Sequence, residues 1–163
     1  MVKILILGHG AHGKDTIAEY LSEFTGLRFE SSSSAACRAA VFPTLSKLYG
    51  YQTIGQCFSD RRNHRQEWKE LITAYNTPDK GRLCKEILEV YDGYIGMRCH
   101  EEFAAVRHLF NWVLWVDASK RCPDDESMTI QKDNDMVVID NNQGKIEAAD
   151  NVLAFAREAG LCG

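Results

Sequence analysis

The chain has 163 residues, of which 45% are hydrophobic and 26% are charged, and its formal net charge at pH 7 is −4. This length predicts a single domain with one hydrophobic core. The acidic balance excludes a generally basic nucleic-acid coat protein but allows a local basic groove.

The cysteines and the N-terminus indicate a reducing compartment. Six cysteines lie far apart with no C-x-x-C pair, and Met1 leads directly into a strand-like run without the apolar region of an export signal. We therefore expect reduced thiols in a cytoplasmic protein. No apolar stretch reaches the length of about 18 residues that a membrane span needs, so no membrane partner is expected.

Strands and helices are predicted to alternate at both ends of the chain. Val2–Leu7 is a continuous apolar run, which is typical of a buried parallel strand, and residues 14–24 carry apolar side chains at helical spacing. This order predicts a parallel sheet of five strands covered by helices. The other predicted elements are strands at 27–29, 93–97, 111–118 and 135–141, and helices at 35–49, 62–75, 78–91, 101–108 and 147–158.

The segment GHGAHGKD joins the first strand to the first helix and has the G-x-x-x-x-G-K spacing of a phosphate-binding loop. Backbone amides of such a loop point at phosphate groups, and Lys14 supplies charge for the β- and γ-phosphates. A glycine-rich turn without a ligand is disfavoured, because the strand and the helix stand on the required sides. We predict a three-layer α/β/α P-loop NTPase fold that binds ATP and Mg²⁺. The predicted nucleotide-binding residues are Gly8, His9, Gly10, Ala11, His12, Gly13, Lys14, Asp15 and Thr16.

One position departs from the usual loop. The residue after the lysine is normally Ser or Thr, which binds magnesium, whereas this chain has Asp15. Asp15 is therefore the predicted metal ligand, directly or through a water, and it is also a candidate base.

The ending GKDT resembles the loop of the deoxynucleoside monophosphate kinases of tailed phages, within the group similar to thymidylate and adenylate kinases. GMR at 96–98 resembles the strand end where those kinases place an arginine facing the acceptor, and LWVDASKR at 114–121 resembles their strand leading into the lid. DMVVIDNNQGKIE at 135–147 resembles their last strand and adenine-side turn. The resemblance implies catalytic roles for Lys14, Asp15, Arg98 and Arg121. It covers about the first 30 and the last 70 residues.

The resemblance also implies how the chain is organised. We expect a single P-loop kinase domain over 1–163, with a helical acceptor-side insertion at about 50–92 and a short lid at about 118–128. Those kinases usually carry an acid two residues before the arginine of the third strand. Here that position is Gly96, which favours Asp15 as the group that holds the metal.

The segment SDRRNHRQEW at 59–68 is the predicted acceptor site. Arg62 and Arg65 at i, i+3 spacing are expected to share a helix face and clamp a phosphate, with Trp68 near enough to stack on a base. A solvated helix start with internal salt bridges is the alternative. The predicted acceptor-binding residues are Ser32, Ser33, Asp60, Arg62, Arg65 and Trp68.

The acceptor itself has two candidates. The resembling phage group includes enzymes that phosphorylate 5-hydroxymethyluracil within DNA, and an open cleft rimmed by arginines favours such a polymer as the acceptor. If the protein is encoded by a phage, it is expected in the host cytoplasm. The alternative is a deoxynucleoside monophosphate kinase that forms dNDP, and a second alternative is a non-catalytic nucleotide sensor. An alcohol acceptor would need a carboxylate base, for which Asp15 and Asp60 are the candidates. The sequence leaves the oligomeric state open.

Overall fold

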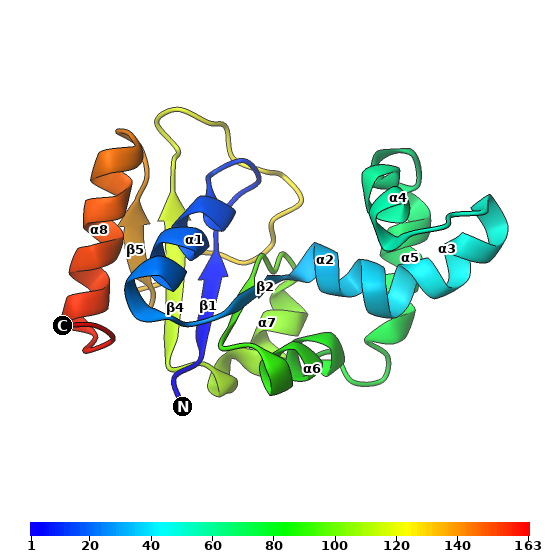
Figure 1. The fold of residues 1–163 in the computed structure, drawn as a ribbon, viewed down its shortest axis with the longest axis horizontal. Coiled ribbons are helices and arrows are strands. Elements are labelled where there is room, and N and C mark those ends of the chain that lie inside the picture. Colours follow the sequence, from blue (N-terminus) through cyan, green and yellow to red (C-terminus); the bar gives the residue numbers. More distant parts are fainter.

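The structure is a computed structural model that describes all of residues 1–163. Five parallel strands form one sheet in the order β2-β3-β1-β4-β5, so the predicted parallel five-stranded sheet is confirmed (Figure 1). Their register pairs Ile4 with Gly93 on one side and with Trp112 on the other. The strands are β1 (Ile4–Leu7), β2 (Phe29–Ser31), β3 (Gly93–Ile95), β4 (Trp112–Asp117) and β5 (Val137–Asp140).

Helices cover both faces of the sheet, because alternate residues of the buried strands point to opposite sides. Ile4 and Ile6 of β1 pack with α1 (Lys14–Thr25) and α8 (Lys145–Glu158). Leu5 and Leu7 pack with α6 (Arg82–Val90) and α7 (His100–Val106) on the other face. Together these three layers form the sheet core. No helix combines the length and the apolar character that crossing a bilayer requires.

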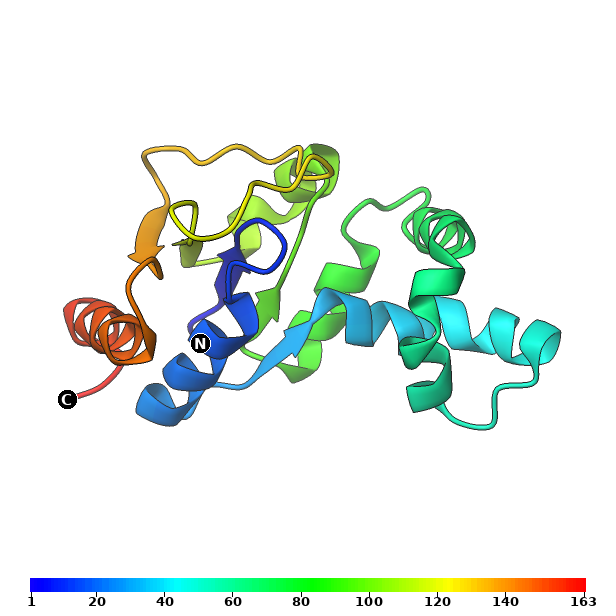
Figure 2. The same cartoon turned by 90° about the horizontal axis from the view of Figure 1, so that it is seen from above.

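A helical lobe, residues 32–75, projects from the β2 edge of the sheet core (Figures 1 and 2). It has a small hydrophobic core of its own, in which Cys37, Leu45, Cys57 and Trp68 are buried. The lobe contains α2 (Ser32–Ala36), a π-helical turn (Cys37–Val41), α3 (Phe42–Tyr49), α4 (Ile54–Ser59), a 3₁₀ turn (Arg61–Asn63) and α5 (Arg65–Tyr75).

The lobe differs from the sequence prediction in two ways. The lobe begins directly after β2 rather than near residue 50, and it ends before α6, which packs on the sheet core. Both bounds of the predicted insertion at 50–92 therefore lie too far along the chain. Helix α4 lies where a turn was predicted. Thr53 and Gln56 start α4 with a capping box, in which each side chain accepts a hydrogen bond from the backbone amide of the other residue.

A polar cluster ends α4 and delays the start of α5. The His64 ring lies between two carboxylates, with Nε2 3.0 Å from Asp60 and Nδ1 2.9 Å from Glu67. Asp60 also accepts hydrogen bonds from the Tyr51 hydroxyl and from the Asn63 amide. These contacts hold His64 at φ −134° and ψ 35°, outside helical geometry, so the predicted helix from residue 62 begins at Arg65 instead.

The connection from β4 to β5 crosses the sheet edge that carries the phosphate-binding loop (Figures 1 and 2). Strand β1 leads through α1 to β2 on one side, whereas its neighbour β4 leads to β5 on the other side. Adjacent strands whose connections diverge in this way leave a crevice at their carboxyl ends, where open α/β sheets bind ligands.

We predict that Gly93→Ala destabilises the protein by about 1–3 kcal/mol, as overpacking of a full core does. A Cβ at Gly93 would lie 2.2 Å from the Phe29 ring and 2.9 Å from the Ile4 carbonyl oxygen, and backbone cannot move aside easily. Urea unfolding at neutral pH measures the change. The matched control is Gly55→Ala in α4, where the nearest atom is 3.8 Å away and the variant should be as stable as the parent or slightly more so. Equal stability of Gly93→Ala and the parent would contradict the packing of β2 on β3.

We also predict that Tyr51→Phe makes the stability less sensitive to acid. Hydrogen bonds from Tyr51, Asn63 and His64 hold the pKa of Asp60 below its ordinary value of 3.8. A lowered pKa in the folded state stabilises the protein above the unfolded-state value, and this contribution is lost as the pH falls below about 4. Urea unfolding at about pH 6 and about pH 3.5 should show a smaller loss for Tyr51→Phe than for the parent. Tyr20→Phe, on α1, is the control and should lose as much as the parent does; identical losses in all three proteins would count against the prediction.

Candidate active site

Backbone conformation and lack of space fix both ends of the loop between β1 and α1. Gly8 has φ +153° and Gly13 has φ +92°, values that side chains disfavour. A Cβ at Gly8 would lie 2.8 Å from the Val116 carbonyl oxygen, and one at Gly13 would lie 2.4 Å from the Asn141 amide nitrogen. The loop is therefore seated against β4 and against the turn after β5.

Lys14, the first residue of α1, reaches back over this loop. Its Nζ donates to the carbonyl oxygens of Gly8 and His9, both at 2.9 Å. Burial, and next the positive charge of Arg98, lower the pKa of the Lys14 ammonium. Its side chain also passes beside Gly96 at the end of β3. The loop, the lysine and the carboxyl end of β3 therefore form one basic corner.

The two loop histidines attach the loop to the segment after β4. The buried His12 ring accepts a hydrogen bond from the Ala118 amide at Nδ1 (3.1 Å), and its Nε2 lies 3.2 Å from the Pro123 carbonyl oxygen. His9 accepts at Nδ1 from the Asp125 amide (2.9 Å). Both side chains are committed to packing and tethering, and the His12 amide donates to the His9 carbonyl oxygen at 3.2 Å. Of the polar groups at these two positions, the His9 amide is therefore the one left for a phosphate.

The segment after β4, residues 118–129, is the lid segment. Arg98 from the end of β3 contacts it through Nη1, 2.7 Å from the Asp125 carboxylate and 2.6 Å from the Ser127 hydroxyl. Arg121 has a different partner, because its Nε donates to the Asn141 backbone carbonyl oxygen at 2.6 Å. The structure therefore brings Lys14 and Arg98 together and holds Arg121 at the turn after β5.

Asp15 and Thr16 lie in the first turn of α1. Asp15 is exposed and makes no hydrogen bond or ion pair, and Thr16 is half-buried. No group of three His, Cys, Asp or Glu side chains gathers anywhere in the structure to form a metal site. A Mg²⁺ ion that is held mainly by substrate phosphates and waters needs only one or two carboxylates, and the free carboxylate of Asp15 beside Lys14 fits that requirement.

Ser32 and Ser33 lie at the carboxyl end of β2. The Ser32 hydroxyl donates to the Gly96 carbonyl oxygen, which places Ser32 at the same basic corner as Lys14. Ser33 is half-buried in the first turn of α2, and its hydroxyl makes no hydrogen bond. The cap of α2 is Ser31, whose side chain accepts from the Ser34 amide. Of the two predicted serines, Ser32 is the one that lies beside the phosphate-binding loop.

The predicted acceptor residues of the lobe are divided between its core and its surface. Trp68 is only 7% exposed and packs in the lobe core, so it is not free to stack on a base. Asp60 is committed to the polar cluster around His64. Arg62 and Arg65 are exposed and free of hydrogen bonds and ion pairs. However, the break at His64 puts them on separate helical segments, so the prediction of a shared helix face is wrong.

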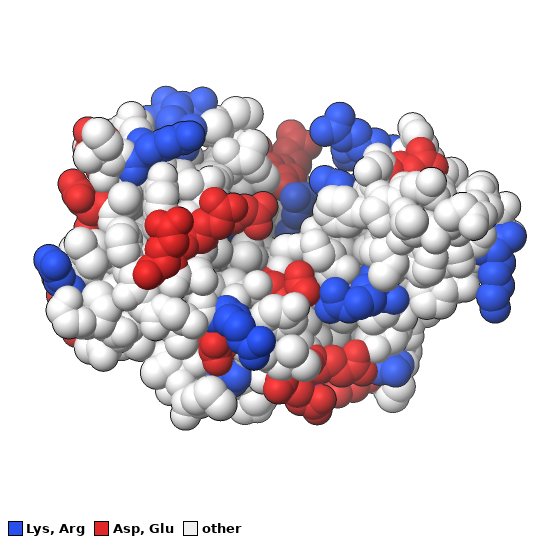
Figure 3. Space-filling view, viewed as in Figure 1, with Lys and Arg blue, Asp and Glu red and all other residues white.

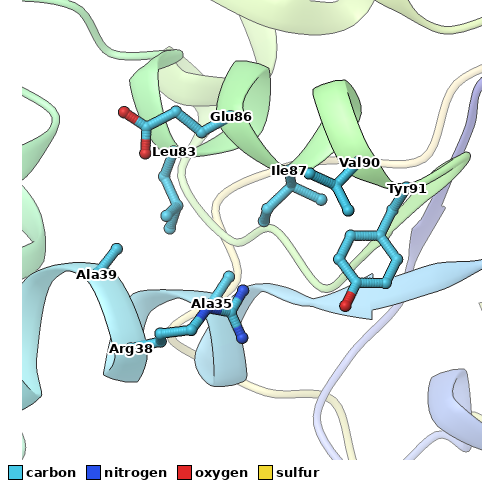
Figure 4. A pocket seen from close by; sticks show the side chains of 8 residues that line it. All are labelled: Ala35, Arg38, Ala39, Leu83, Glu86, Ile87, Val90 and Tyr91. Atoms are coloured by element: carbon cyan, nitrogen blue, oxygen red, sulfur yellow. The ribbon is translucent and has the colours of Figure 1, made fainter.

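Two depressions lie where the lobe meets the sheet core. One of them is the hollow between the lobe and the sheet core in Figure 3, which has basic and acidic side chains on its rim. A separate groove runs between α2 and α6 (Figure 4), and none of the predicted site residues lines it. Its lining residues are Ala35, Arg38, Ala39, Leu83, Glu86, Ile87, Val90 and Tyr91.

Sequence reasoning missed Asp125 and Asn141. Asp125 contacts Arg98, which lies 27 positions earlier in the chain, and Asn141 donates to the His12 carbonyl oxygen at 2.8 Å across 129 positions. Neither residue stands at a recognisable spacing from its partner. The only local signal was the position of Asp125 in the predicted lid.

No protein-family model matches the chain, and no curated protein matches it in sequence. Solved structures do match its fold. A gluconokinase from Sinorhizobium meliloti 1021 aligns with a TM-score of 0.53 and 14% identity over 98% of this chain and 94% of its own. An unliganded sugar kinase from Janibacter sp. HTCC2649 aligns with a TM-score of 0.51 and 16% identity over 100% and 99% of the two chains. TT1252 from Thermus thermophilus aligns with a TM-score of 0.58 and 18% identity over 99% and 98%.

These similarities cover nearly the whole of each chain at low sequence identity. They establish that the chain has the α/β fold of these solved proteins, two of which are described as kinases of small molecules. Neither of the two described kinases is named as a nucleotide kinase or a DNA kinase, so the comparisons do not support the narrower resemblance. What these similarities show is the fold, a parallel five-stranded sheet covered by helices.

Proposed function

We propose that this protein is an ATP-dependent phosphotransferase. The observation that carries the proposal is the loop from Gly8 to Gly13, which is seated at the divergence of β1 and β4 and runs into the N-terminus of α1. Loop amides and the positive end of a helix together attract phosphate groups. Lys14 adds a mobile positive charge at the same corner.

Phosphoryl transfer depends mainly on positioning and on charge stabilisation, which this corner is equipped to supply. In the proposed reaction Lys14 leaves the carbonyl oxygens of Gly8 and His9 and contacts the β- and γ-phosphates. Arg98 stabilises charge on the transferred group, and Arg121 closes on the donor from the lid segment. Asp15 would hold Mg²⁺, which when bound neutralises the phosphate oxygens.

The acceptor is proposed to be an anionic molecule that carries a hydroxyl or phosphate group. Arg62 and Arg65 support this proposal, because they are exposed and unpaired on the lobe. The sequence resemblance favours 5-hydroxymethyluracil in DNA, with a dNMP as the alternative. The solved neighbours suggest a third anion, gluconate. For an alcohol acceptor Asp15 is the better proposed base, because Asp60 is already hydrogen-bonded to Tyr51, Asn63 and His64.

We predict transfer of label from γ-labelled ATP, with Mg²⁺, to one member of an acceptor panel. The panel contains each dNMP, gluconate, unmodified DNA and DNA with 5-hydroxymethyluracil. Lys14→Ala should lower kcat/KM on the order of 10²–10³-fold, as the loss of one charge-stabilising donor does. Lys80→Ala, which removes an exposed lysine that makes no hydrogen bond, is the control and should transfer like the parent.

The outcomes of this assay separate the candidates. Label on the modified DNA, on a dNMP or on gluconate identifies the acceptor class. ATP binding without transfer to any acceptor would favour the non-catalytic sensor, and normal turnover by Lys14→Ala would contradict the proposed role of the loop.

We further predict that Arg62→Ala and Arg65→Ala each raise the KM for the acceptor about tenfold, which corresponds to one hydrogen bond to a charged group. The KM for ATP should stay unchanged, because neither residue lies near the phosphate-binding loop in the chain or in the fold. Arg157→Ala, on the exposed side of α8, is the control for removing an arginine. An unchanged acceptor KM in both lobe variants would assign these arginines to the solvated surface.

A further inference from the structure

The lid segment is fastened across the phosphate-binding loop at several points. The Asp125 amide donates to His9, and the Pro123 carbonyl oxygen lies 3.2 Å from His12 Nε2. On the far side of the loop, the Thr129 amide and hydroxyl both donate to the Arg98 carbonyl oxygen, at 2.9 and 2.8 Å. The segment is thus attached both to the loop and to the end of β3, and its middle lies over the site.

The Asp125 carboxylate occupies the centre of this crossing. Its Oδ2 lies against the backbone of Gly10, 3.1 Å from the position that a Cβ of Gly10 would take. The same oxygen is 2.7 Å from Arg98 Nη1. The Ser127 amide and hydroxyl hold the other carboxylate oxygen at 2.9 and 2.7 Å. The side chain is only 20% exposed, so water screens these contacts incompletely.

These partners are the ones that the proposed function assigns to a phosphate group. A place beside the glycine backbone of the loop and a guanidinium can receive either a carboxylate oxygen or a phosphate oxygen, because both are anionic acceptors. Lys14 is close enough for its charge to interact with that of Asp125, yet its ammonium is satisfied by the loop's own carbonyl oxygens. Asp125 and a triphosphate would therefore compete for Gly10 and Arg98.

We propose that Asp125 occupies an anion position of the phosphate-binding loop in the free protein, and that the triphosphate of ATP must displace it in order to bind. This inference rests on the proposed function and adds a self-blocked state to it. Displacement frees Arg98 for the transferred phosphate and releases the middle of the lid segment, while the attachment of Thr129 to the Arg98 carbonyl oxygen is kept. The apparent Kd for ATP is then the Kd of the unblocked protein divided by the fraction of molecules in which Asp125 is not seated.

A different role for Asp125 predicts the opposite result. If its carboxylate helped to hold Mg²⁺ with the nucleotide, removal of its charge would weaken the binding of ATP. The ion pair with Arg98 and the hydrogen bonds from Ser127 favour the blocking role, because protein groups already balance the charge of the carboxylate and satisfy its oxygens.

The test is the dissociation constant of ATP with Mg²⁺, measured by calorimetry for the parent and three variants. Asp125→Asn keeps the size of the side chain but removes the charge that pairs with Arg98, and it should lower the Kd about tenfold if about a tenth of the parent molecules are unblocked. Ser127→Ala removes a hydroxyl that holds both Asp125 and Arg98, and it should lower the Kd by a smaller factor. Asp124→Asn is the control, since this exposed neighbour lies 3.7 Å from His9 and should leave the Kd unchanged.

Each outcome decides the inference. An equal or higher Kd for Asp125→Asn than for the parent, with ATP bound by both, would overturn the blocking role and leave the proposed function standing. An equal fall in Kd for Asp124→Asn would overturn it as well, because a general loss of negative charge would then explain the gain. If none of the four folded proteins bound ATP, the proposed function would fail and the inference with it.

Discussion

The site depends on one constraint, the seating of the loop glycines against neighbouring backbone and side chain. The Val116 carbonyl oxygen leaves no room for a side chain at Gly8, and the Asn141 amide leaves none at Gly13. Strand β4 and the turn after β5 therefore set both ends of the loop. Because both loop ends are fixed, the backbone between them forms a preorganised array, which under the proposed function would receive an anion without moving its own backbone. The rest of the site is arranged around that array.

Buried polar side chains maintain this seating. His12 uses both ring nitrogens. The Asn141 side-chain amide donates to the His12 carbonyl oxygen, and the Asn141 backbone carbonyl oxygen accepts from Arg121. Since Nδ1 accepts from the Ala118 amide, Nε2 is the nitrogen that faces the Pro123 carbonyl oxygen as a donor. A buried polar group without a partner costs about 1–3 kcal/mol, so this network favours one arrangement of loop, lid segment and final turn. It also leaves His12 without a free nitrogen for proton transfer.

The features that the sequence predicted well are those encoded by neighbouring residues. The loop spacing from Gly8 to Lys14 lies within one short segment, between an apolar strand and an amphipathic helix, so its context was visible locally. The lobe was predicted less well, because Trp68 is buried by residues from the π-helical turn, α3 and α4, which lie elsewhere in the chain. Helix α4 carried a local signal in Thr53 and Gln56, which Gly55 and the preceding turn residues obscured. The contact of Asp125 with Arg98 depends on the folded path of the lid segment and has no counterpart in sequence spacing.

The arginines of the molecule fall into two groups with different surroundings. Arg98 and Arg121, on the donor side, are already bound by Asp125 and by the Asn141 carbonyl oxygen. Arg62 and Arg65, on the lobe, have no partner. On the donor side the charge of Arg98 is thus balanced by a carboxylate and Arg121 is hydrogen-bonded, whereas charge on the lobe faces water. Under the proposed function, an anion that reaches the lobe would exchange only water, but one that reaches the loop would also have to replace a carboxylate. The cost of rearrangement would then fall on donor binding, and the same replacement that admits the proposed triphosphate would make Arg98 available to it.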